Sequence, residues 1–273
     1  MLLREIVRSC NYDRMGDPTH LLAPDQLAGV HEKLKRAEES IQNLNSEIVA
    51  FLSERPEGGF SGDKENVAKE LAEFHAKRGI PLRFGVIAGE IAHHLRSSLE
   101  HVVWLLSAGQ YRLDHPRWIG FPIATVKPTT KNELTTYGRQ VKGILSSDAR
   151  ALVERLQPYN AANPADDPLA ILHDLDREDK HQTLTLMVCA WNATFSFPLS
   201  TSSSLMIPRS PFYKQVEAEG WLSLPLASKP KLDFTPYVAF AQIGRWKGES
   251  VIPTLTHLLN TVKDDPLQRF AEL

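Results

Sequence analysis

The chain has 273 residues, of which 42% are hydrophobic and 23% are charged, and its formal net charge is −2. This composition supplies enough apolar material for a packed core and excludes a globally disordered chain. The near-neutral balance gives no overall electrostatic signature for nucleic acid or an acidic membrane, although it leaves a local basic groove open.

The number of cysteines and the composition of the N-terminal stretch indicate the cellular compartment to expect. Cys10 and Cys189 are the only cysteines, which excludes the disulfide framework of a small secreted domain. The first residues carry Arg4, Glu5 and Arg8 and no long apolar run, so they do not have the pattern of a signal peptide. No apolar run approaches the roughly 20 residues that a membrane span needs. We therefore expect a cytoplasmic protein with no membrane partner.

Taken in chain order, the hydrophobic pattern is first irregular and then helical. Residues 1–22 lack a clear period and are expected to form a loosely held arm. Apolar residues at helical spacing, with proline and glycine breaks between them, predict helices over 24–54, 64–77 and 84–107. Residues 110–143 contain three prolines and a polar run, and we expect them to be mostly irregular.

The pattern changes in the last third of the chain. Helices are predicted at about 145–157 and 169–181. Residues 183–199 are rich in β-branched and aromatic side chains and predict a strand, and two more strands are expected near 231–244. A final helix is predicted over 251–262, where Pro253 is tolerated in the first turn.

This order of elements predicts an α+β protein rather than a βαβ alternation. A bundle-like helical part would be followed by a β-containing part and a final helix. We divide the chain into an arm (1–22), a helical domain (23–182) and a β-rich C-terminal region (183–273). The C-terminal region is either a separate domain or a layer of the helical one.

The helix predicted over 84–107 carries the most informative pattern, GEIAHHLRSSLEHVVWLLS at residues 89–107. Histidine titrates near neutral pH and can move protons or bind metals, so a helix with three histidines is the predicted functional site. At about 100° per residue, one side of this helix is apolar. That side carries Ala88, Ile91, Leu95, Leu99, Val102 and Leu106; the opposite side carries Glu90, His94, Ser97 and His101, with His93, Arg96 and Glu100 in the strip beside it.

Arg96 and His101 form an R-x4-H pattern, and in this the helix resembles the HEPN superfamily, helical proteins that include metal-independent ribonucleases and usually act as dimers. Ser97 stands where those nucleases often have Asn, Asp or His. The helix also resembles a group of bacterial proteins with no established activity, which share a GE-I-x-H-x-LRS-x-L-x-H helix and a later LD-x-x-DKH element, here residues 175–181. The resemblance covers about residues 84–182.

The resemblance implies an endoribonuclease or RNA-binding module that acts as a homodimer and needs no cofactor. In such a site a histidine serves as acid or base, and an arginine holds the scissile phosphate. The predicted catalytic residues are Arg96, His101, His94 and His181, and the predicted substrate-binding residues are His93, Ser97 and Lys180.

The R-x4-H pattern also has a purely structural interpretation. On an ideal helix Arg96 and His101 point about 140° apart. They could converge only through the reach of the arginine or across a symmetric dimer. Arg96 and Glu100 could instead form an i,i+4 ion pair, with the histidines as partly buried polar residues.

Two other functions stay open. One is a non-catalytic interaction protein in which the helix over 24–54 mediates assembly. The other is a di-metal, oxidase-like helical bundle, in which paired E-x-x-H motifs supply the ligands. Those ligands would be Glu90, His93, Glu178 and His181. The sequence contains no P-loop, G-x-G-x-x-G, C-x-x-C or G-x-S-x-G motif, which disfavours ATPases, dinucleotide enzymes and α/β-hydrolases.

Overall fold

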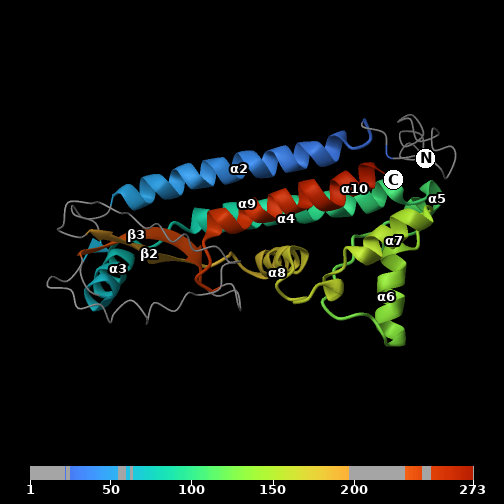
Figure 1. Cartoon of the computed structure of the whole chain (residues 1–273). Coiled ribbons are helices and arrows are strands. Elements are labelled where there is room, and N and C mark those ends of the chain that lie inside the picture. Colours follow the sequence, from blue (N-terminus) through green and yellow to red (C-terminus); the bar gives the residue numbers. More distant parts are fainter. Residues whose placement is uncertain are drawn as a thin grey trace. The chain divides into compact units, whose positions relative to one another are not determined.

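The computed structural model describes residues 22, 25–54, 60–61, 64–196, 231–241 and 247–272, and it has the predicted α+β layout (Figure 1). The predicted arm, apart from Leu22, lies outside these residues. Contacts divide the chain into two compact units, which are described separately. Unit 1 comprises Met1–Glu39, Glu90–Arg177 and Thr256–Leu273, and unit 2 comprises Ser40–Gly89 and Glu178–Leu255. The division predicted at residue 182 stays a prediction.

The predicted helices are confirmed, with small shifts at their ends. They are α2 (Ala28–Ser53), α3 (Lys64–Arg78), α4 (Leu82–Leu106), α7 (Ser147–Arg155), α8 (Pro168–His181) and α9 (Val251–Val262). A π-helical turn (Lys263–Leu267) and the short α10 (Gln268–Ala271) follow α9. Helix α3 ends where Gly79 takes a φ of 61°, a left-handed conformation that glycine adopts without strain. None of the described helices is long and apolar enough to cross a membrane.

The prediction that residues 110–143 are mostly irregular holds for only about half of them. They contain most of α5 (Gly109–Asp114) and all of α6 (Lys131–Val141). Helix α6 begins with a capping box, in which the Thr130 side chain accepts from the Glu133 N–H and the Glu133 carboxylate accepts from the Thr130 N–H. These bonds satisfy N–H groups that have no partner inside the helix. The T-x-x-E signature of this capping box is present in the sequence, but it lies within a polar run that is otherwise typical of a loop.

Unit 2 contains an antiparallel sheet of β1 (Phe60–Ser61), β2 (Leu186–Ser196) and β3 (Lys231–Phe240), in the order β1-β3-β2. The strand predicted over 183–199 is confirmed as β2. The two strands predicted near 231–244 are a single strand, because β3 pairs with β2 along its whole length. In the described part of the sheet, β1 pairs with β3 at residues 233 and 234 and does not reach Pro236. The missing N–H of this proline is therefore tolerated.

Glycine allows a close approach within unit 2. A β-carbon at Gly85 would lie 2.1 Å from the backbone oxygen of Leu184, which is closer than any side chain permits. Helix α4 can therefore pack against the chain just before β2 only with glycine at this position.

Three phenylalanine rings also pack together in unit 2. The ring of Phe51 meets those of Phe74 and Phe84 edge-on, at centroid distances of 5.4 and 5.8 Å.

In unit 1, segments of α2, α4 and α9 lie side by side (Figure 1). The apolar side of α4 is buried as predicted, and Ile91, Leu95, Leu99 and Val102 have no exposed surface. The polar residues of α4 are divided between two sets of neighbours. Some contact α2, and others contact α8 and the segment around residue 121. This division decides which of the predicted site residues can act together.

Candidate functional site

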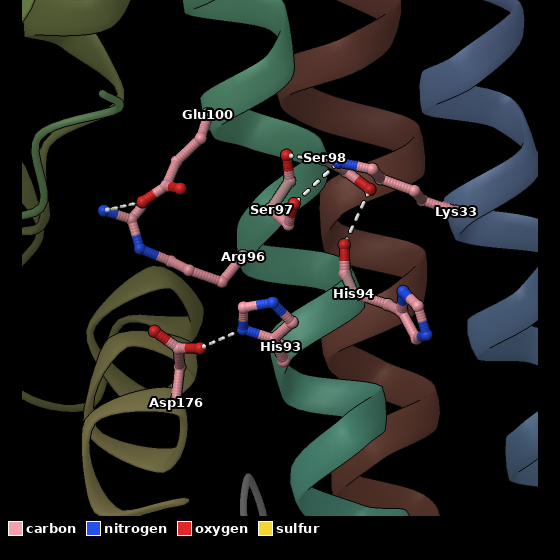
Figure 2. Close-up of polar contacts among 8 residues, drawn as sticks. All are labelled: Lys33, His93, His94, Arg96, Ser97, Ser98, Glu100 and Asp176. Atoms are coloured by element: carbon pink, nitrogen blue, oxygen red, sulfur yellow. Dashed lines mark hydrogen bonds and ion pairs between the residues drawn. The ribbon is translucent and has the colours of Figure 1, made fainter. Parts of the chain in front are cut away.

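A hydrogen-bonded pair of His93 and Asp176 joins α4 to α8 (Figure 2). The His93 Nδ1 lies 3.1 Å from the Asp176 Oδ1, and Nδ1 must carry the proton, because an ionised carboxylate only accepts. The His93 side chain is 57% exposed, whereas that of Asp176 is 3% exposed. A buried carboxylate at Nδ1 fixes the orientation and tautomer of the imidazole and presents Nε2 to a substrate. The pair therefore has the geometry of an acid–base site.

Arg96 lies near this pair but is itself buried. Its Nη2 donates to the Phe121 carbonyl at 2.6 Å and lies 3.5 Å from the Glu100 carboxylate, and its side chain is 8% exposed. Among the described residues, the buried Nη1 has no hydrogen-bond partner. Burial lowers the pKa of Arg96, against the opposing charges of Glu100 and Asp176, and the guanidinium stays a cation. Arg96 is thus placed to balance the charge of Asp176 rather than to hold a phosphate from solvent.

A buried glutamine is hydrogen-bonded to the segment that follows Phe121. Gln157 is 1% exposed, and its Nε2 donates to the carbonyls of Pro122 and Val153, both at 2.9 Å. Its Oε1 accepts from the Ala124 N–H at 3.2 Å. These bonds fix the segment that supplies an acceptor to the arginine, because a buried amide must find partners for its donors and its acceptor.

His173, on α8, adds a further group beside the arginine. Burial lowers the pKa of His173, and the positive charge of Arg96 lowers it further, while Asp174 opposes the shift. Its Nδ1 is buried and has no hydrogen-bond partner within the described parts of the chain. We expect a neutral imidazole at neutral pH, because an adjacent cation and burial both disfavour the charged form.

Ser97 and His101 contact α2 on another side of α4 (Figure 2 shows Ser97). The Lys33 Nζ donates to the Ser97 Oγ at 2.6 Å and to the Ser97 carbonyl at 3.5 Å. The His101 ring lies against Gly29, where a β-carbon would be 2.9 Å from the ring Cε1. Arg96 contacts the segment around residue 121 instead. Within one chain, the two members of the R-x4-H pattern therefore have different neighbours and do not share a site.

The histidines on the α2 side are held in their neutral form. Burial lowers the pKa of both His94 and His101. The positive charge of Arg36 lowers the pKa of His94 further, the Glu90 carboxylate opposes this shift, and the positive charge of Lys33 lowers the pKa of both histidines. A neutral imidazole can exchange hydrogen bonds, but it cannot hold a phosphate by charge.

The remaining predicted residues lie at the C-terminal end of α8. Lys180 and His181 are exposed there and belong to unit 2, whereas the predicted residues of α4 belong to unit 1. The Glu178 carboxylate accepts from the side chain of Gln182. Across the described ranges, no three His, Cys, Asp or Glu side chains are arranged to hold a metal ion. The di-metal alternative with Glu90, His93, Glu178 and His181 therefore gains no support.

Sequence reasoning missed two contributors. Asp176 was not among the predicted site residues, although its spacing of four from Leu172, which is buried, places it on the inner side of α8. Lys33 carried no signal, because it meets Ser97 from 64 positions away in the sequence.

Comparison of the chain with protein-family models, with curated proteins and with solved structures finds no match. The resemblance to the HEPN superfamily therefore stays a prediction. The hydrogen bond between His93 and Asp176 is then the main structural indication of a function.

Proposed function

We propose that the protein is a metal-independent endoribonuclease in which His93, positioned by Asp176, transfers the proton. One observation carries this proposal: an exposed imidazole is hydrogen-bonded through Nδ1 to a buried carboxylate. This arrangement supports acid–base chemistry in general. The substrate, RNA, is inferred from the resemblance of helix α4 to the HEPN superfamily. The proposal keeps the predicted reaction and transfers the central role from His101 to His93.

RNA itself supplies the nucleophile for this reaction. A base removes the proton of a ribose 2′-hydroxyl, and the oxygen attacks the adjacent phosphorus. The bond from phosphorus to the 5′ oxygen breaks, and that oxygen takes a proton from water or from a histidine of a second copy. The product is a 2′,3′-cyclic phosphate, and no oxidant or cofactor takes part. His93 would accept the first proton at Nε2, and Asp176 would stabilise the imidazolium that forms.

Arg96 has a positioning role in this proposal. Its guanidinium donates to the Phe121 carbonyl and interacts electrostatically with Asp176, so it is held inside the protein. A buried carboxylate is tolerated only when a positive charge or several hydrogen bonds compensate for its lost hydration. Arg96 therefore supports the partner of His93 and does not itself contact the substrate.

The proposal is tested by cleavage of a fluorescent single-stranded RNA in EDTA, with His93→Gln and His101→Gln as matched variants. We expect His93→Gln to lower the rate by about 100-fold or more, which is the usual contribution of a general base. His101→Gln should cleave at close to the wild-type rate. A fully 2′-O-methylated RNA should remain intact, because it lacks the nucleophile.

Three outcomes would contradict the proposal. Equal cleavage by wild type and His93→Gln would remove the role of His93, and loss of cleavage in EDTA would show that a metal is needed. If His101→Gln alone abolished cleavage, the R-x4-H pattern would hold the catalytic histidine after all.

The role of Asp176 has its own test, because a buried aspartate could also be purely structural. Asp176→Asn should lower cleavage and shift the neutral His93 ring from the Nδ1–H toward the commoner Nε2–H tautomer. The nitrogen chemical shifts of a ¹⁵N-histidine-labelled sample report this tautomer directly. An unchanged tautomer in the folded variant would show that Asp176 does not position His93.

A non-catalytic interaction protein remains the competing class. In that alternative the helix predicted over 24–54 mediates assembly. The apolar residues Val30, Leu34 and Ala37 of α2 are buried within the chain itself, which leaves this part of the helix without an apolar face for a partner. Absence of cleavage by every form of the protein would favour this alternative.

A further inference from the structure

A group of polar side chains lies where α2 and α4 meet in unit 1 (Figure 2). Lys33 comes from α2, and His94 and Ser97 come from α4. Arg36, one turn further along α2, is close enough for its charge to lower the pKa of His94. The Arg36 side chain is 61% exposed and makes a long contact of 3.8 Å with Glu39. Lys33 and Arg36 thus bring two positive charges to this junction, and the Glu90 carboxylate opposes their effect on the pKa of His94.

The ammonium group of Lys33 is held by neutral oxygens. Its hydrogen bonds go to the hydroxyl and the carbonyl of Ser97, at 2.6 and 3.5 Å. No carboxylate lies within ion-pair distance of it in the described part of the chain. A half-buried ammonium that is fixed in place and lacks a counter-ion is suited to an anion. The Ser97 oxygen accepts from Lys33, so its own O–H can donate to the same anion.

This group adjoins the proposed acid–base site. The ring centroids of His93 and His94 are 6.5 Å apart, and His94 lies on the side of His93 that faces α2 (Figure 2). A strand whose scissile phosphate lies at His93 would therefore bring a neighbouring phosphate toward Lys33. The neutral His94 ring could share a hydrogen bond with that phosphate.

We propose that Lys33 and Ser97, with His94 beside them, form a binding subsite for the phosphate next to the scissile one in an RNA strand. This inference rests on the proposed ribonuclease function for the identity of the strand. The subsite reads the backbone and not the base, because an ammonium and a hydroxyl recognise phosphate oxygens. It gives a function to Lys33, which nothing in the sequence singled out.

The test measures binding separately from cleavage. The probe is a fully 2′-O-methylated RNA with a 5′-fluorescein label, followed by fluorescence anisotropy in EDTA over a series of KCl concentrations. Lys33→Gln should weaken binding by about 10-fold, the range expected for one hydrogen bond to a charged group. It should also reduce the slope of log affinity against log salt by about 0.7, the contribution of one phosphate in a single strand.

Matched variants separate the subsite from general charge and from folding. Lys35→Gln removes a lysine that lines a different hollow, between α2 and the C-terminal helices, and should bind as wild type does. Lys33→Arg keeps the charge and should retain most of the affinity. If Lys33→Gln does not give the wild-type circular dichroism spectrum, Ser97→Ala replaces it and should weaken binding without a change in charge.

The possible results distinguish the phosphate subsite from the ribonuclease function. Unchanged affinity and slope in Lys33→Gln, or an equal loss in Lys35→Gln, would overturn the subsite. Failure of the wild-type protein to bind the probe would overturn the subsite and the ribonuclease together. Binding that depends on Lys33, without cleavage of ordinary RNA, would keep the subsite and overturn the ribonuclease alone.

Discussion

Arg96 and His101 are five residues apart on one helix, yet the fold gives them different surroundings. Arg96 is buried against the carbonyl of Phe121, and His101 packs on Gly29 of α2. Five helical steps turn the side chain through about 140°, and α4 has a different neighbour in each of these directions. A sequence motif at this spacing therefore says little about a shared site within one chain.

The structural role of Arg96 leads to a prediction about stability. Arg96→Met should lower the free energy of unfolding by about 1–3 kcal/mol, because it leaves the Phe121 carbonyl without its donor and removes a buried positive charge that interacts with Asp176. Arg177→Met is the matched control. Its side chain is 61% exposed and pairs with Asp174 at the surface, so the change should be within about 0.5 kcal/mol. Urea denaturation measures both, and equal effects would contradict the buried role.

At the scale of elements, two helical glycines have opposite roles. Gly85 is needed where α4 passes the backbone of Leu184, whereas a β-carbon at Gly138 in α6 would meet nothing within 4 Å. Helix α6 has no buried residues, so Gly138 there only weakens the helix.

These contacts predict opposite effects of the same substitution. Gly85→Ala should destabilise unit 2 by about 1–3 kcal/mol, because α4 or the chain before β2 must move. Gly138→Ala should stabilise α6 by about 0.5–1 kcal/mol, since alanine is the better helix former. Thermal unfolding followed by circular dichroism measures both variants. A stabilising effect of Gly85→Ala would show that the close approach is not required.

The sequence predicted most elements but not all of them. The long helices were predictable because their apolar residues repeat at i, i+3 and i+4. Helix α6 was missed because its few apolar residues, Leu134, Tyr137 and Val141, stand within a polar run that follows three prolines, although its capping box marked its start. The single strand β3 was predicted as two, because the local sequence does not show that the whole segment pairs with β2 or that Pro236 lies beyond the described pairing with β1.

At the scale of the whole molecule, several histidines are buried enough to link stability to pH. Burial lowers the pKa of four of the described histidines below the ordinary value near 6.5. They are His94, His101, His173 and His257. In the unfolded chain each binds a proton at a higher pH than in the fold. Their contribution to stability is therefore complete above about pH 6.5 and is lost as the pH falls through the folded pKa values.

We therefore expect the melting temperature to fall as the pH is lowered from neutral toward about 5. His173→Gln should make this fall smaller, because one of the groups that resists protonation is removed. His75→Gln, at an exposed position in α3, should leave the pH dependence unchanged. Differential scanning calorimetry at several pH values measures all three proteins. An unaltered pH dependence in His173→Gln would contradict the role of burial.

The sequence by itself determined the α+β layout, the long helices and the apolar side of α4. These depend on interactions between residues a few positions apart, which a local pattern records. The tertiary structure decided which polar residues become partners. His93 meets Asp176 across 83 positions and Lys33 meets Ser97 across 64, so neither contact leaves a local pattern. The burial of Arg96 and the lowered pKa of His101 likewise arise from neighbours on other elements, because hydration and nearby charge are properties of the folded chain.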